Sequence, residues 1–185
     1  MPQASPEEIG QELSDLAFGV VEQNWLAQHI GKAVDLKGLG QLQLNVAEWE
    51  LTYLILFAIT NGCGTFSAAD RARTTAILKA FHSTLLSHIA EQAGQEVADE
   101  HKKSLPARYR LYGPAIEGED MNKPYKTPYR LLGEAAALQI LGKPLTDPHD
   151  ADNFRESIKV IFTEVREAAI KIMSFQQAQA IEGKA

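Results

Sequence analysis

Apolar residues recur every three or four positions along the last part of this chain, and this stripe limits the possible folds more than any other feature. It consists of Phe154, Ile158, Ile161, Val165, Ala168, Ile172 and Phe175. The spacings alternate strictly between four and three, which is the heptad pattern of a helix packed nearly in line with its neighbours. A helix over 150–180 would be ~45 Å long, which exceeds the expected width of a single domain. We therefore expect its end to project or to pack on a second copy.

Two further helices are predicted in the first third of the chain. Ser5 precedes a proline and two acids, which is typical of a helix start, and the apolar periodicity continues to about His29. Residues 44–60 are apolar on nearly every side, so we expect a helix surrounded by others. Glu48 and Glu50 flank Trp49 at its start and face differently, so at least one of them should lie on the surface.

The remaining boundaries follow from turn and capping residues. Residues 31–43 contain three glycines and predict a loop. Ser67 is the expected N-cap of a helix that ends near residue 93, or continues to 103. Thr127 and Pro128 open a fifth helix that ends before Gly142.

Residues 101–130 differ from the rest of the chain because they are basic and rich in tyrosine and proline. They hold four of the five tyrosines, four of the eight prolines and seven of the eighteen lysines and arginines. Their formal charge is +4 in a chain whose net charge is −6. Four prolines exclude a long helix, so we expect an irregular segment that lies across the bundle.

This 101–130 segment is the candidate binding site, because a cation lies beside each of three tyrosines. Such groups bind phosphorylated ligands and single-stranded nucleic acid, and they are also enriched at protein interfaces. A structural role is open as well, since a tyrosine can close a bundle with its ring inward and its hydroxyl in water. The candidate residues are Arg108, Tyr109, Arg110, Tyr125, Lys126, Tyr129 and Arg130.

Composition limits the classes of function. An acidic chain is not expected to bind nucleic acid over its whole surface, because phosphates require clustered cations. The single cysteine, Cys63, excludes an intrachain disulfide and fits a reducing compartment. The most apolar run, 51–59, is shorter than the ~20 residues of a membrane span. No basic and apolar leader is visible at the N-terminus, so we expect a soluble, cytoplasmic protein without a membrane partner.

The histidines lack the spacing of a metal site. None of the five has an acid three residues before it, as a di-iron site in a bundle requires, and no two are four apart, as a helical zinc pair requires. His88 is in register with the apolar stripe of its helix. We interpret it as a core histidine with a hydrogen-bond partner, although a single histidine could still bind haem. Neither a metal nor a cofactor is expected.

Two other motifs resemble chemical sites but have simpler interpretations. Cys63 lies between two glycines, where an exposed thiol could become reactive, and pairing in space with His82 or His88 is open. We interpret it as a small residue in a turn. The acids at 147–153 lack the glycine and the terminal glutamate of a calcium loop. We interpret them as the start of the last helix, where negative charge opposes the helix dipole.

These features predict an all-α, single-domain bundle of five or six helices over residues 1–185, ordered from about 5 to 180, with an irregular Pro/Tyr-rich segment at 101–130. The first hypothesis is a non-catalytic protein-interaction or regulatory module that forms a homodimer through the helix at 150–180. The alternative is a binder of an anionic small molecule or single-stranded nucleic acid at 101–130. An enzyme that uses His88 with Cys63 or a buried glutamate has the least support, so no catalytic residue is assigned.

Overall fold

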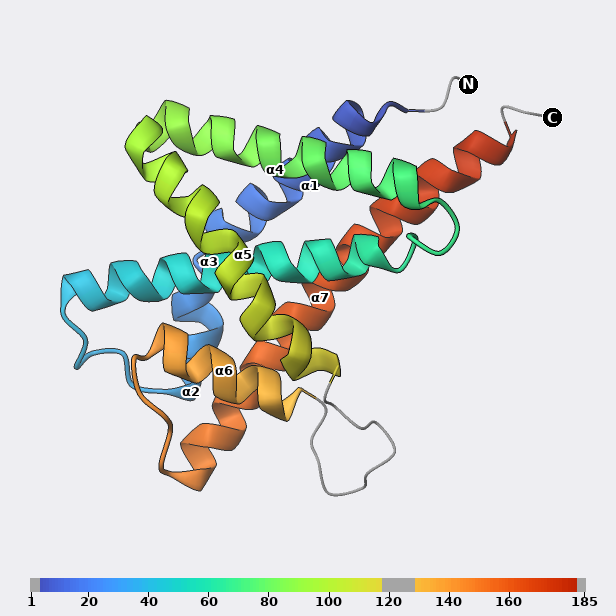
Figure 1. Cartoon of the computed structure of the whole chain (residues 1–185). Coiled ribbons are helices and arrows are strands. Elements are labelled where there is room, and N and C mark those ends of the chain that lie inside the picture. Colours follow the sequence, from blue (N-terminus) through green and yellow to red (C-terminus); the bar gives the residue numbers. More distant parts are fainter. Residues whose placement is uncertain (1–3, 118–128, 183–185) are drawn as a thin grey trace, which may run out of the picture.

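The chain folds into helices, as Figure 1 shows. They enclose a continuous apolar core. The computed structural model describes residues 4–117 and 129–182, which contain seven α-helices, one π-helical turn and no strand. The elements are α1 (Pro6–Glu22), η1 (Leu26–Ile30), α2 (Gly31–Ala33), α3 (Gln41–Gly64), α4 (Arg71–Ala93), α5 (Gln95–Glu117), α6 (Arg130–Ile140) and α7 (Pro148–Glu182). The all-α prediction is confirmed, whereas the described residues hold more helices than the five or six predicted.

Helix α3 lies at the centre and contacts α1, α4, α5, α6 and α7. Its length and composition would allow it to cross a membrane, but 61% of its most apolar window is buried inside the protein. This burial is typical of a core helix in a soluble protein. Of the two acids at its start, Glu48 is exposed and Glu50 is buried, which confirms the prediction that they face differently.

Glycines allow close approach where helices cross. A Cβ on Gly10 would lie 2.7 Å from the backbone nitrogen of Phe81, so α1 and α4 are nearly in backbone contact there. A Cβ on Gly62 would lie 2.7 Å from the carbonyl oxygen of Arg166 in α7. Gly62 therefore serves helix packing. The helix predicted over 44–60 extends further at both ends, because α3 runs from Gln41 to Gly64.

Local capping rules correctly predicted the first helix start and misplaced another. The Ser5 hydroxyl accepts from the Glu8 backbone N–H at 3.1 Å, and the Glu8 carboxylate accepts from the Ser5 N–H at 2.7 Å. In α4 the N-cap is Asp70, whose carboxylate accepts from the Arg73 N–H at 2.9 Å. Ser67 lies instead in the turns that connect α3 to α4, where its N–H donates to the carbonyl of Gly64.

The first helix ends at Glu22 and not near His29 as predicted. Asn24 has a φ of 53°, a left-handed conformation that asparagine tolerates better than most residues. The chain then resumes as η1 and α2, so helical structure extends to Ala33. The loop before α3 is thus limited to residues 34–40, shorter than the predicted 31–43.

Helix α5 contains Pro106 and Pro114, so the prediction of an irregular 101–130 segment is wrong as far as residue 117. Each proline removes a backbone hydrogen bond and costs roughly 3 kcal/mol in a helix interior. Both prolines are exposed, and water can hydrogen-bond the carbonyls that they leave free. Contacts of the opposite face with α3 stabilise the helix. Residues 118–128 lie outside the described residues, and they include the predicted helix start at 127–128.

Helix α7 does not keep the heptad register in its second half. A strict heptad drifts by about 20° per repeat around a straight helix, so the core face moves to neighbouring positions. The first four stripe residues are buried, but Ala168 and Ile172 are half-buried and Phe175 is 59% exposed. Ala169 and Met173 take the buried positions instead. The C-terminal half of α7 therefore exposes the aromatic ring of Phe175 to solvent.

Candidate functional site

Five of the seven candidate residues of the 101–130 segment are described by the structure, and these five do not line a common site. Tyr125 and Lys126 lie outside the described residues. Arg108 and Tyr109 turn toward α3, where each has polar partners. Arg110, on the same helix, is exposed. An approaching ligand would therefore meet Arg110 but not the two residues before it, unless existing contacts were displaced.

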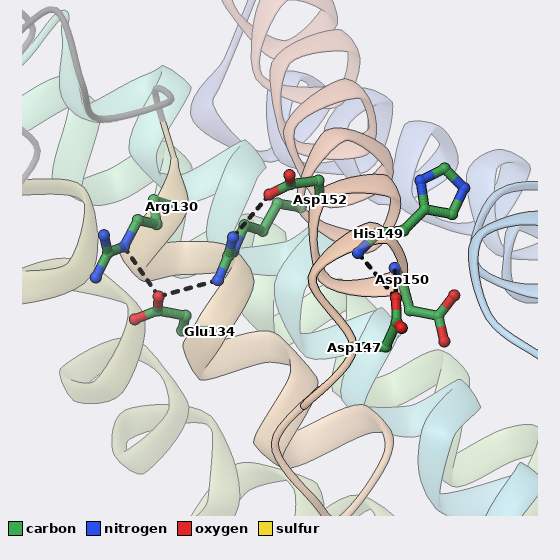
Figure 2. Close-up of polar contacts among 7 residues, drawn as sticks. Arg130, Glu134, Asp147, His149, Asp150 and Asp152 are labelled. Carbon is green, nitrogen blue, oxygen red and sulfur yellow. Dashed lines mark hydrogen bonds and ion pairs between the residues drawn. The ribbon is translucent and has the colours of Figure 1, made fainter.

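The two candidates at the start of α6 have partners of their own. The ring of Tyr129 packs on that of Phe162, with 5.5 Å between the ring centroids. Arg130 donates from Nε to Glu134 Oε1 at 2.9 Å, as Figure 2 shows. An anion at this end of the segment would have to compete with the Glu134 carboxylate.

A buried ion pair joins α3 to α5. Glu50 is only 5% exposed, and its carboxylate accepts from Arg108 Nε at 2.6 Å and from a second guanidinium nitrogen. The guanidinium carbon lies 5.8 Å from the centroid of the Tyr53 ring. The hydrogen bonds that Arg108 donates to Glu50 raise the pKa of Arg108. Among the described residues, Arg108 is the cation that compensates the charge of this buried carboxylate.

A tyrosine–histidine hydrogen bond lies one turn away. The Tyr53 hydroxyl is 2.5 Å from His101 Nδ1, and the His101 ring packs on Trp49 at 3.8 Å between centroids. Burial lowers the pKa of His101 and raises the pKa of Tyr53, so both groups stay neutral and Tyr53 donates the proton. Trp49 links this buried cluster to the surface, because its side chain remains 37% exposed.

A second polar chain closes the contact between α3, α4 and α5. The Thr60 hydroxyl donates to the Tyr109 oxygen at 3.2 Å, and Tyr109 lies 2.8 Å from His82 Nε2. His82 Nδ1 lies 2.7 Å from the carbonyl oxygen of Leu78, which can only accept. Burial lowers the pKa of His82, so the neutral ring donates from Nδ1 and accepts from Tyr109 at Nε2. Every member has a partner, which is typical of a structural network.

Cys63 lies in the core and not in an exposed turn. It is fully buried, and burial raises the pKa of its thiol to about 12. A thiolate would therefore not form near neutral pH, and the thiolate is the nucleophilic form of cysteine. Cys63 acts as a small apolar residue in α3, which supports the structural interpretation of this residue.

A groove that the sequence did not predict runs along α1, between α3 and α4. It consists of three adjoining hollows. The first, between α1 and α4, has a volume of about 630 Å³. The second has about 230 Å³ and shares Phe18 and Glu22 with the first. The third, between α1 and α3, has about 270 Å³ and shares Val21 and Thr52 with the second. We refer to the three together as the α1–α3–α4 groove.

The middle of this groove has exposed apolar walls. Trp49 is 37% exposed and Val21 is 40% exposed, and both line the second hollow. Leu42 and Val46, 77% and 48% exposed, precede Trp49 at helical spacing along α3. Because residues at i, i+4 and i+7 share one helix face, these side chains extend the apolar surface away from the groove.

The polar walls of the groove are acidic. Asp15, Glu22 and Glu91 line the first hollow, and Glu48 lines the third. No lysine or arginine is found among the described residues that line the three hollows. Ser14 also lines the first hollow; it is fully buried, and its hydroxyl has no hydrogen-bond partner within the described part of the chain. The groove therefore combines negative charge with an unused hydrogen-bonding group.

His88 belongs to the wall of this groove and not to the core, contrary to the prediction. It is half-buried, packs on Phe18 at 4.1 Å between ring centroids, and lies 2.6 Å from the side-chain amide of Gln92. The core positions of α4 include Phe81, Leu85 and Ile89, and His88 falls beside that row. Within the described ranges, no group of three metal-ligating side chains occurs.

The acids near residue 150 cap a helix, as predicted. The Asp147 carboxylate accepts from the backbone N–H groups of His149 at 2.9 Å and Asp150 at 3.1 Å, at the start of α7 (Figure 2). Asp152 accepts from Arg155 at 2.9 Å. These contacts account for the position of the acids without a bound cation.

Comparison of the chain with protein-family models, with curated proteins and with solved structures finds no match. The groove, the buried polar clusters and the exposed apolar residues are therefore the features that bear on function. The groove could not be predicted from the sequence, because its walls come from residues far apart in the chain, such as Asp15, Glu48 and Glu91. The one local signal was Trp49, a large aromatic residue between two acids.

Proposed function

We propose that this protein is a non-catalytic helical module that binds another protein in the α1–α3–α4 groove. The observation that carries the proposal is the exposure of Trp49 and Val21 inside a concave surface. Exposed aromatic and aliphatic side chains gathered in one hollow are typical of interaction sites, and tryptophan is enriched among residues that dominate binding energy. The adjacent Leu42 and Val46 would enlarge the contact area.

The buried polar groups support a non-catalytic role. The catalytic alternative uses His88 with Cys63 or a buried glutamate. His88 lines the groove, but Cys63 and Glu50 are buried and line none of the three hollows. His82 and His101 also lie outside the lining, inside contacts between helices. The two histidines already have hydrogen-bond partners, and burial lowers the pKa of both. A substrate would have to open the interface of α5 to reach them.

A second candidate is self-association through α7, favoured by the exposure of Phe175. Glu164 and Lys171 are both exposed, and their spacing to Phe175 places the three on one side of the helix. Two copies of α7 packed antiparallel would bring each glutamate opposite the partner's lysine, as a two-fold interface requires. The anionic-ligand alternative has less support, because Arg108 and Arg130 already pair with carboxylates.

The proposal is tested by placing the photoreactive residue p-benzoylphenylalanine at Thr52, which borders two of the hollows. Irradiation in the native cell extract should give a heavier adduct with one identifiable protein, and that protein should bind the purified chain. Trp49→Ala should weaken this binding about 30-fold, because truncating a central aromatic anchor costs on the order of 2 kcal/mol.

The same photoreactive residue at two other positions provides the comparison. Ala72 is exposed on α4 and does not line the groove, so it should give no adduct. An adduct of twice the mass of the chain from position 175 would support the homodimer instead. Equal labelling at 52 and 72, or an adduct from position 175 alone, would contradict binding in the groove.

A further inference from the structure

The groove has two kinds of surface along its length. The second hollow is mainly apolar, with Trp49 and Val21 beside Leu85 and Ile89. Such a hollow favours aliphatic or aromatic side chains, because their transfer from water contributes roughly 25 cal/mol per Å² of buried surface. An occupant must therefore present an apolar face to the middle of the groove.

The two flanking hollows favour an occupant that carries positive charge. Asp15, Glu22 and Glu91 border the first hollow and Glu48 borders the third, without a lysine or arginine among the described lining residues. Four carboxylates along one groove repel anions and attract cations. The buried hydroxyl of Ser14, which has no partner among the described residues, is a second, independent observation, because a polar group of an occupant of the first hollow could satisfy it.

The dimensions fit one helix. The hollows follow α1 from Gln11 to Glu22, which at the rise of an α-helix corresponds to roughly 17 Å, or about three helical turns, and they continue to Leu26 at the start of η1. The walls are helices, so no sheet edge in this region can pair with an extended peptide. A helix satisfies its own backbone and can place one apolar face into a groove.

We infer that the occupant of the groove is a basic amphipathic helix of a partner protein, with aliphatic or aromatic residues on one face and lysine or arginine on the other. This inference rests on the proposed function and specifies the chemistry of the partner. The apolar face lies in the second hollow, against Trp49. The basic face extends to the carboxylates of the two flanking hollows. Nucleic acids and anionic membranes do not fit, because the same carboxylates repel phosphate.

The test is a titration of the full chain with three synthetic helical peptides that share one leucine- and phenylalanine-rich face. Their polar faces carry lysine and arginine, glutamine, or glutamate. The basic peptide should bind at least about ten times more tightly than the glutamine peptide, and the glutamate peptide most weakly. Raising the salt concentration should weaken the basic peptide most. Emission of the two tryptophans should shift on binding, because Trp49 and Trp25 both line the groove.

Two charge variants locate the site. Changing Asp15, Glu22, Glu48 and Glu91 to the corresponding amides should lower the affinity for the basic peptide at least about tenfold, with unchanged helicity. The same change at Asp152, Glu156, Glu164 and Glu167 on α7 alters the net charge equally and should have little effect. If the groove variant binds like the wild type, or if no peptide binds, the inference is wrong. If all three peptides bind equally in the groove, the basic partner is excluded while the proposed function stands.

Discussion

Replacing Arg108 with methionine is expected to lower the free energy of unfolding by about 3 kcal/mol. The change leaves the Glu50 carboxylate, only 5% exposed, without its cation and without two of its hydrogen bonds. Removal of one partner from a buried ion pair costs about 3–5 kcal/mol. The Arg108 side chain is 28% exposed, so water reaches the site and the lower end of that range applies. Urea denaturation followed by circular dichroism measures the loss.

A double replacement separates the lost charge from the lost packing. Changing both Glu50 and Arg108 to methionine should return the stability to within about 1 kcal/mol of the wild type, because apolar residues of similar size often replace a buried pair without loss. Arg110→Met is the control, since Arg110 is exposed on the same helix and should change stability by less than about 0.5 kcal/mol. A single Arg108 variant as stable as the Arg110 variant would show that the pair does not hold α5 on α3.

Replacing Gly10 with alanine should lower the free energy of unfolding by about 1–3 kcal/mol, the range for an overpacked core. The added methyl group would lie 2.7 Å from both the Cβ of Ala80 and the backbone nitrogen of Phe81. A backbone atom cannot rotate away as a flexible side chain can, so α1 and α4 would have to separate. Thermal unfolding of the variant measures the effect. Separation of α1 and α4 should also alter binding in the groove, because these two helices form the walls of the first hollow.

Gly19 provides a matched control on the same helix. A Cβ at Gly19 would have no heavy atom within 4 Å, so Gly19→Ala meets no obstacle. It should raise stability by up to about 1 kcal/mol, because alanine loses less conformational entropy than glycine in a helix. Opposite signs for the two substitutions are expected. Destabilisation of the same size at both positions would mean that helix propensity, and not the close crossing, decides the result.

Features set by neighbouring residues could be predicted from the sequence. The capping box at Ser5 and the cap at Asp147 depend on groups within three residues of each other. The central position of α3 followed from its uniform apolarity, which only burial on all sides can satisfy. These predictions needed no knowledge of how the helices meet.

Features set by contacts between helices could not be predicted in the same way. Proline rules excluded a helix through Pro106 and Pro114, but α5 persists because His101, Arg108 and Tyr109 bind partners on α3 and α4. Each of those partners lies at least 27 residues away in the chain. Likewise, the heptad along α7 placed Ile172 and Phe175 on the apolar stripe, but the core face of the helix follows Ala169 and Met173.

The candidate site also depends on contacts between helices that the sequence does not predict. Clustered tyrosines and cations predicted a binding site at 101–130, but Arg108, Tyr109 and Arg130 make contacts within the protein. Val21 lies in the apolar register of α1 and gave no sign that it would be 40% exposed. A groove forms where neighbouring helices leave space between them. The periodicity of the sequence predicts which face of each helix is apolar, but it does not predict that space.

The most direct test of the groove as the binding surface is a map of backbone amide chemical shifts in the isotope-labelled full chain, titrated with the basic helical peptide. The largest changes should fall on Ser14, Phe18, Val21, Trp49 and His88, which come from three helices and meet only in the groove. Changes centred on Phe175 would instead indicate the exposed side of α7, and changes centred on Arg110 and Tyr129 would indicate the 101–130 segment. Either of those patterns would contradict the account.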